Sequence, residues 1–375
     1  MTLSFSSNDY PTVGVEVELQ LVDATSMALR SAIDDILERL PPELEGKIKP
    51  ELMQCYLEIN SDVCRTVADV EGDLSRKIKL VEQSARDANV LLLWAATHPF
   101  SHWHEQKITP DDRYLGLVDL LQDTARRLVT FGLHVHVGVD SGDKAVMICD
   151  RIMRHLPTLL ALSSNSPFWH GRLTGLRSQR SKVMENLPTA GLPPLMRNWS
   201  EYVWLINHLI QTGFINSNRE IWWDVRPHHV FGTVEVRICD MPPSLEDVLG
   251  LTALTQCLVH SLSEAINAGT FQHDGHPMIV RQNKWRAGRF GMDAQLVDPQ
   301  TAECLPAREV VRRLVEILMP AAEHLDCVGY LEHVLVMAER PTGADRQIEI
   351  YKRTNDSLQV VRELTGNNPH ANATS

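Results

Sequence analysis

The chain has 375 residues, 43% of them apolar and 22% charged, which is the composition of a globular protein with a large core. Its formal net charge of −12 argues against nucleic acid as a partner, because phosphate backbones are bound by clustered Lys and Arg. No apolar run approaches the roughly 20 residues that span a bilayer, so no membrane association is expected.

Residue periodicity predicts both strands and helices along the chain. Strands are expected at 12–22, 53–60, 90–97 and 132–139, with two more within 222–240. Helices are expected at 33–40, 67–89, 111–130, 144–162 (interrupted at Pro157), 199–212, 245–268, 307–324, 331–339 and 347–364. Residues 165–194, rich in Ser, Pro, Gly and Arg, are predicted to form a long ordered loop. We expect residues 1–365 to form one domain, followed by a disordered tail at 366–375.

The seven cysteines are scattered, odd in number and without a C-x-x-C pair. This usage is typical of reduced thiols, and the N-terminus lacks the features of a signal peptide, so a cytoplasmic location is predicted. Cys64, Cys239 and Cys257 lie among apolar residues and are expected in the core.

The first candidate site lies on strand 12–22, where residues two positions apart share a face. Glu16 and Glu18 therefore point the same way as Gln20. Adjacent carboxylates destabilise each other unless a cation lies between them, and oxygen ligands suit Mg²⁺ or Mn²⁺. An exposed sheet face with solvated glutamates is the alternative explanation.

A second polar doublet, His134 and His136, shares one face of strand 132–139. Imidazole is a common metal ligand and also donates to phosphate oxygens. Two structural histidines with satisfied hydrogen bonds would explain the doublet equally well.

A third doublet, Glu235 and Arg237, lies on the last strand together with Thr233, and Arg226 lies on the strand before it. An ordinary ion pair would explain this strand alone. Three distant strands that each present Glu, His or Arg match a site for metal ions and anionic oxygens. Phosphoryl transfer needs such a site, because charge on the transferring group is spread over several oxygens. Further candidates are Glu58 and the loop cations Arg177, Arg180 and Lys182, although each cation could be a surface charge and Arg177 is expected to be one.

Several common nucleotide and hydrolase motifs are absent from the sequence. It contains no G-x-x-x-x-G-K-[ST], no kinase signature set, no G-x-S-x-G and no G-x-G-x-x-G after a strand. A nucleotide would therefore be held through carboxylate-bound metal ions on an open antiparallel sheet.

Ordered segments of the chain resemble the YbdK-type carboxylate-amine ligases of the glutamate-cysteine ligase family, type 2. The segments are GVEVELQLV, YLEINSDVC, THPF, GLHVHVG, SSNSPFW, WWDVRP, FGTVEVRICD and NKWRAGRFG, collinear from about residue 14 to about residue 298. The resemblance implies an α+β, glutamine-synthetase-like fold, in which a curved antiparallel sheet carries the active site and helices cover its outer side. It also implies ATP, Mg²⁺ (with Mn²⁺ as the alternative ion) and an acyl-phosphate intermediate.

Carried over by position, the resemblance implies a role for each candidate. Glu51 would position the attacking amine or take its proton. Arg226 and Arg237, with Arg180, would neutralise the transferred phosphoryl group or the substrate carboxylate. His136 would lie near the nucleotide phosphates, where Arg180 and Lys182 are also expected to bind the nucleotide. The metal-binding positions are Glu16, Glu18, Glu58, His134 and Glu235.

Two departures from the family pattern affect the expected substrates. Leu173 stands where an acidic residue is common, and His228-His229 follow Pro227 where a second proline is frequent. Both are expected where substrate side chains are recognised.

The sequence therefore predicts an ATP-dependent ligase that joins the carboxylate of glutamate, or a similar amino acid, to an amine. Its partners would be small molecules, with residues 165–194 as a lid that excludes water. The apolar faces of the C-terminal helices are more typical of core than of an interface, so a homodimer has little support in the sequence. Three rivals stay open at this stage. They are a true glutamate-cysteine ligase, a regulatory protein that binds metal or nucleotide, and a zinc hydrolase using His134 and His136, which would show repeated strand–helix units.

Overall fold

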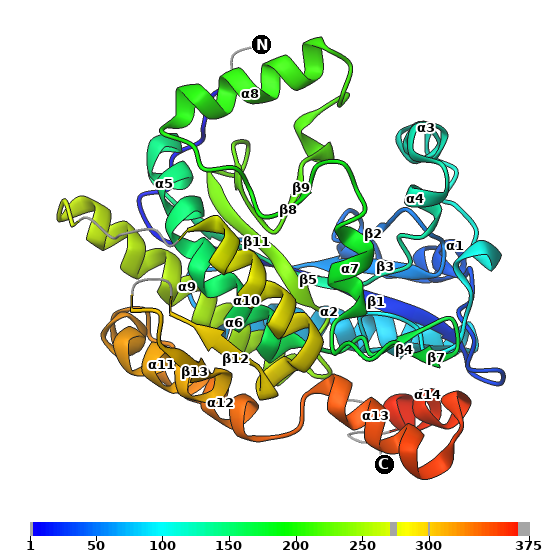
Figure 1. Ribbon diagram of the computed structural model, residues 1–375. Coiled ribbons are helices and arrows are strands. Elements are labelled where there is room, and N and C mark those ends of the chain that lie inside the picture. The colour runs from blue at the N-terminus through cyan, green and yellow to red at the C-terminus, as the bar shows by residue number, and fades with distance from the viewer. Residues whose placement is uncertain (1–2, 271–275, 299–300, 367–375) are drawn as a thin grey trace.

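The computed structural model describes residues 3–270, 276–298 and 301–366 (Figure 1). Its centre is a seven-stranded sheet in the order β10–β11–β5–β1–β3–β2, with β4 also paired to β1. All of these pairs are antiparallel, as predicted. The strands are β1 (Val13–Asp23), β2 (Ile48–Pro50), β3 (Tyr56–Asn60), β4 (Val90–Leu93), β5 (Gly132–Gly138), β10 (Val225–His228) and β11 (Thr233–Asp240).

Strand register brings the polar doublets together. Glu16 of β1 lies opposite His134 of β5, and Glu18 lies opposite Glu58 of β3. His136 lies opposite Glu235 of β11. Directly opposed residues have Cβ atoms about 4.5–5.5 Å apart, so side chains distant in sequence become neighbours on one face.

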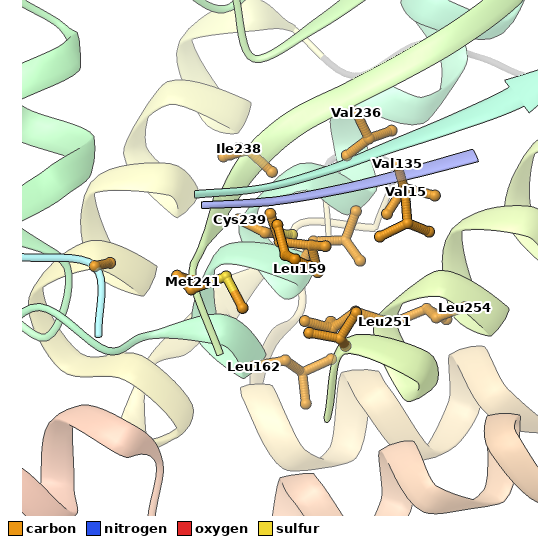
Figure 2. Close-up of a cluster of buried hydrophobic side chains, with 14 of the residues drawn as sticks. Val15, Val135, Leu159, Leu162, Val236, Ile238, Cys239, Met241, Leu251 and Leu254 are labelled. Atoms are coloured by element: carbon orange, nitrogen blue, oxygen red, sulfur yellow. The ribbon is translucent and has the colours of Figure 1, made fainter. Parts of the chain in front are cut away.

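The other face of the sheet is apolar and covered by helices. Val15, Val135 and Ile238 lie in one buried cluster with Leu159 of α6 and Leu251 of α9 (Figure 2). Each buried side chain of this size stabilises the fold by about 1.5–3 kcal/mol. The covering helices are α2 (Val67–Asp87), α5 (Gly142–Ile152), α6 (Leu156–Ser163) and α9 (Leu245–Asn267), with α11 (Ala307–His324) and α12 (Val328–Glu339) packed behind α9.

Two helices that were predicted to be continuous are each divided into two helices in the structure. The segment 111–130 divides into α3 (Asp112–Leu121) and α4 (Asp123–Arg126), with Gln122 at φ 49°. The segment 347–364 belongs to α13 (Gly343–Thr354) and α14 (Ser357–Gly366), separated by Asn355 at φ 52°. A residue in this left-handed region ends an α-helix, and periodicity alone does not reveal it.

The prediction of a loop over 165–194 is wrong, because the segment contains short strands and a helix. The segment contains β6 (Phe168–Trp169), β7 (Arg172–Leu173), α7 (Gln179–Met184) and β8 (Ala190–Gly191). The buried carboxylate of Asp240 accepts hydrogen bonds from the Asn165 amide at 2.9 Å and from the hydroxyls of Ser166 and Ser178 at 2.6 and 2.8 Å. The first half of the segment therefore cannot move as a lid without breaking buried hydrogen bonds.

Helix α10 (Pro277–Phe290) was not predicted, although it carries the NKWRAGRF block. Its buried side includes the polar residues Asn283 and Lys284, so no apolar stripe marks it in the sequence. The remaining elements include α1 (Ile33–Leu37), α8 (Trp199–Gln211), β9 (Trp222–Trp223), β12 (Gln295–Val297) and β13 (Cys304–Pro306).

The predicted tail at 366–375 lies outside the described residues, apart from Gly366 at the end of α14. Cys64, Cys239 and Cys257 are buried as expected. Among the described residues, no helix is long and apolar enough to cross a membrane.

Candidate active site

Two groups of carboxylates and imidazoles share Glu16 on the polar face of the sheet. One group is Glu16, Glu58 and His134, and the other is Glu16, His136 and Glu235. Within each group, one potential ligand atom per residue lies within 4.8 Å of the others. Oε2 of Glu16 is 2.9 Å from Nδ1 of His134, and Oε1 is 3.3 Å from Nε2 of His136. One carboxylate thus offers an oxygen to each group.

His136 is oriented for metal binding by its neighbour on β11. Its Nδ1 lies 3.1 Å from the hydroxyl of Thr233, which leaves Nε2 facing Glu16 and Glu235. That Nε2 is buried and has no hydrogen-bond partner among the described residues. A buried nitrogen left in this way costs about 1–3 kcal/mol, and a divalent cation would satisfy it. The donor set therefore fits metal ions, and His136, predicted near the phosphates, lies among the potential ligands.

Glu16 and Glu235 are kept ionised by neighbouring arginine and histidine side chains. Burial raises the pKa of Glu16, but the hydrogen bond with His134 and the neighbouring ring of His136 outweigh burial and keep that pKa well below its usual value. Burial also raises the pKa of Glu235, but the charges of Arg226 and Arg237 outweigh burial and keep that pKa well below its usual value. For His134, burial and the charge of Arg237 lower the pKa to about 4, so its ring is neutral and able to bind a metal ion.

Arg226 and Arg237 lie beside these groups, as predicted for cations that meet anionic oxygens. Nε of Arg226 is 2.7 Å from Oε2 of Glu235, and Arg237 donates to the other oxygen of the same carboxylate. On the β10 side of β11, the Arg237 amide donates to the Asp224 carbonyl at 2.8 Å, whereas the ladder between β11 and β5 shifts register between Val236 and Cys239. Such a bulge redirects a side chain, and here it accompanies the placement of Arg237.

Glu18 belongs to neither group of potential ligands. Its carboxylate accepts the amide hydrogen of Gly132, and burial raises its pKa to about 7. Arg180 lies nearby, fully buried, and donates to the carbonyls of Ile238 and Arg237 at 3.2 Å each. Arg180 therefore supports the backbone that carries Arg237 and lines the site from beneath.

Lys182 lies apart from the potential metal ligands. Its Nζ is 2.8 Å from Glu185, whose other oxygen is 2.9 Å from Lys284. Arg177, predicted as a surface charge, instead forms an ion pair with Asp345 at 2.5 Å.

A cavity of about 90 Å³ opens beside Glu18 and Arg237, at the end of the sheet away from His136. Glu51 lines it and accepts a hydrogen bond from the Tyr114 hydroxyl at 3.1 Å. Burial, with the charges of Glu58 and Glu18, raises the pKa of Glu51 well above its usual value. Arg113, Tyr114 and Trp222 also line the cavity, and sequence reasoning did not select them, because α3 and the two-residue β9 give no polar doublet.

The two departures from the family pattern lie in different places. Leu173 is partly buried and packs against a small cluster of Phe168, Ile350 and Val360, and its expected part in substrate recognition stays a prediction. His228 lies beside His136, with ring centroids 5.5 Å apart, and does face the polar side of the sheet.

Two solved structures share this fold over nearly all of the chain. A bifunctional glutathione synthetase from Pasteurella multocida aligns with a TM-score of 0.67 and 14% identity, covering 95% of this chain and 52% of that one. A glutamate–cysteine ligase from Francisella tularensis, solved with AMP, aligns with a TM-score of 0.67 and 12% identity, covering 96% and 89%. At these identities the likeness shows the fold alone.

A family model matches residues 12–365, and this match together with the antiparallel sheet and its carboxylate–imidazole groups defines an ATP-dependent ligase that forms carbon–nitrogen bonds. The matching model is that of glutamate–cysteine ligase family 2, so the chain belongs to that family. A Gloeobacter violaceus protein named "Putative glutamate–cysteine ligase 2" is 44% identical, over 97% of this chain and 98% of its own. A Frankia alni relative with a similar name is 41% identical, over 96% of each chain.

Proposed function

We propose that this chain phosphorylates the carboxylate of an amino acid with ATP and then joins the activated acid to an amine. The observation that carries this proposal is the shared carboxylate of Glu16, which offers one oxygen to each of two potential metal groups. Two adjacent cations are suited to a polyphosphate, whose charge is spread over several oxygens. In the described part of the chain, the strands of the seven-stranded sheet pair antiparallel, whereas the zinc hydrolase alternative predicts repeated parallel units.

Mg²⁺ is the proposed ion, with Mn²⁺ as a substitute that accepts imidazole more readily. The ligands would be Glu16, Glu58, His134, His136 and Glu235. Glu18, directly opposite Glu58 in the sheet, would support the site. When bound, the ions would neutralise charge on the phosphoryl oxygens.

The two ends of the polar face would take different substrates. Nucleotide phosphates would lie over the half that contains His136, where Arg226 and Arg237 can exchange the carboxylate of Glu235 for phosphoryl oxygens. The acid and the amine would enter by the cavity at Glu51. Glu51 would take the proton of the attacking amine, because its raised pKa makes it a stronger base than a solvated carboxylate.

Glutamate is the proposed acid, and the names of the relatives point to cysteine as one amine to test. We would measure ADP release from MgATP with glutamate against a panel of amines that includes cysteine. Glu58→Gln is the inactive variant, and Glu45→Gln, an exposed carboxylate outside both groups, is its matched control. Release that needs acid and amine together, and is lost only in Glu58→Gln, supports the proposal. Failure of ATP to bind with Mg²⁺ would overturn it.

Three further expectations remain predictions. They are a single catalytic domain over residues 1–365, binding of nucleotide by Arg180 and Lys182, and assembly of a homodimer in the cytoplasm. Light scattering coupled to size-exclusion chromatography would decide the oligomeric state.

A further inference from the structure

Three aromatic rings meet beside His136, at the end of the polar face opposite the Glu51 cavity. The rings of His228 and Phe231 are stacked, with centroids 4.2 Å apart and planes 16° from parallel. His136 meets both edge-on, at 5.5 Å from His228 and 5.7 Å from Phe231. A stacked pair therefore borders the half of the site in which we place the nucleotide phosphates.

Phe231 is exposed despite its size. Its exposed fraction is 56%, although His228 covers one face of the ring, so much of the ring is open to solvent. Phenylalanine in a hairpin turn gains little from such exposure, because burial of its apolar surface is what stabilises a fold. An exposed aromatic face next to a polar site is a feature of ligand-binding surfaces.

The turn that carries Phe231 is fixed by several hydrogen bonds. The Phe231 amide donates to Nδ1 of His228 at 3.3 Å, and the side-chain amide of Asn8 donates to the carbonyls of Phe231 and Gly232 at 2.9 and 2.8 Å. Gly232 has φ 66°, and a Cβ atom there would lie 2.0 Å from the Ser6 carbonyl oxygen. These contacts fix the backbone of the turn that carries the ring, which reduces the ordering cost of binding a flat ligand.

The geometry leaves one end of the site for the base of the nucleotide. The opposite end is the cavity of about 90 Å³ at Glu51, in which we place the acid and the amine. A nucleotide with its phosphates over His136 and Glu16 would extend the other way, over His228 and Phe231.

We propose that Phe231, supported by His228, is the stacking platform for the purine base of ATP. This inference rests on the proposed function, because it assumes that nucleotide phosphates lie over His136. Stacking on an aromatic side chain needs no base-specific hydrogen bonds, and its loss on substitution by alanine typically weakens binding roughly 5- to 150-fold.

The test compares two ligands that differ only in whether they carry a nucleoside. Titration calorimetry with Mg²⁺ would measure the affinity of ATP and of inorganic triphosphate for the wild-type chain, Phe231→Ala and Phe231→Tyr. Val230→Ala is the matched control, because Val230 is the neighbouring turn residue and is 60% exposed. We expect Phe231→Ala to weaken ATP by at least about fivefold while triphosphate binding is unchanged, and Phe231→Tyr to bind ATP as the wild type does.

The other outcomes are distinguishable. If Phe231→Ala binds ATP as tightly as the wild type, or loses ATP and triphosphate to the same extent, the platform is overturned and the proposed function is untouched. Equal loss of ATP affinity in Val230→Ala would overturn it too, because the effect would belong to the turn. If the wild-type chain binds neither ligand, the proposed function fails and the platform with it.

Discussion

Nε2 of His136 lies 3.3 Å from Oε1 of Glu16, while the other oxygen of that carboxylate contacts His134. The two potential metal groups are therefore not independent. They meet at one carboxylate on β1, the central strand to which β3 and β5 both pair.

Glu16→Gln should weaken both metal sites, whereas Glu58→Gln should weaken only the site that also contains His134. An amide offers one neutral oxygen where a carboxylate offers two charged ones, and Mg²⁺ and Mn²⁺ favour charged oxygen ligands. Electron paramagnetic resonance would count bound Mn²⁺, with Glu45→Gln as the exposed control. Retention of wild-type Mn²⁺ binding in Glu16→Gln would contradict the shared carboxylate.

Gly132→Ala should destabilise the protein and reduce activity. A Cβ atom at position 132 would lie 2.2 Å from a guanidinium nitrogen of Arg180, which is buried and donates to the backbone of β11. Overpacking of this kind costs about 1–3 kcal/mol, and displacement of Arg180 would also move the backbone under Arg237. Urea unfolding would measure the change.

Gly72→Ala is the matched control for that substitution, because a Cβ atom there meets nothing within 4 Å on helix α2. Alanine stabilises a helix interior by up to about 1 kcal/mol relative to glycine. Equal changes in the free energy of unfolding for Gly72→Ala and Gly132→Ala would show that the effect at position 132 is not a clash with Arg180.

His98, in the THPF segment, should make stability depend on pH. Burial lowers its pKa to about 3, and its Nδ1 accepts the amide hydrogens of Phe100 and Ser101 at 3.3 and 2.9 Å, so the folded protein holds the ring neutral. The unfolded chain takes up a proton near pH 6.5, so the free energy of unfolding falls as pH drops from about 6.5 toward 3.

Between pH 6.5 and 5 this histidine alone should remove on the order of 2 kcal/mol. Comparison of urea unfolding at the two pH values would show a smaller loss in His98→Asn, which keeps an acceptor near the position of Nδ1. His104→Asn, at an exposed position, should behave like the wild type. An identical pH dependence in His98→Asn would show that another group is responsible.

Asp240→Asn should destabilise the segment that begins at Asn165. Asp240 is fully buried and accepts three hydrogen bonds through its two carboxylate oxygens. An amide has one oxygen and one NH₂ group, so it could not accept from all three donors. The expected cost is about 1–3 kcal/mol. Limited proteolysis should then reveal new cleavage within 165–194, and unchanged resistance would mean that other contacts hold the segment.

The part of the site that could be predicted from sequence is the part encoded by period-two alternation. Glu16, His134 and Glu235 occupy polar positions on strands whose other face is valine-rich, and strand pairing brings them together. Strand alternation could not show that Arg180 of α7 is directed toward the sheet. Arg180 donates to the carbonyls of Arg237 and Ile238, which lie at a bulge that has no sequence signal.

Long-range packing also decided features that local patterns miss. Helix α10 buries polar side chains, among them Lys284, whose Nζ lies 2.6 Å from Asp224 on the connection before β10. The break at Gln122 depends on a positive φ at a residue that is compatible with helix by composition, so a window of sequence does not contain it. Asn355 is different, because asparagine readily adopts the left-handed conformation that ends a helix, and this local signal was not used in the prediction.

The most direct measurement follows an oxygen atom from the acid to the phosphate. The reaction would be run with MgATP, the amine found active in the ADP-release panel, and glutamate carrying ¹⁸O in its side-chain carboxylate. Phosphoryl transfer to that carboxylate, followed by attack of the amine, predicts ADP together with inorganic phosphate that contains one ¹⁸O per turnover. Label in AMP accompanied by pyrophosphate, or unlabelled phosphate at full turnover, would contradict the acyl-phosphate route.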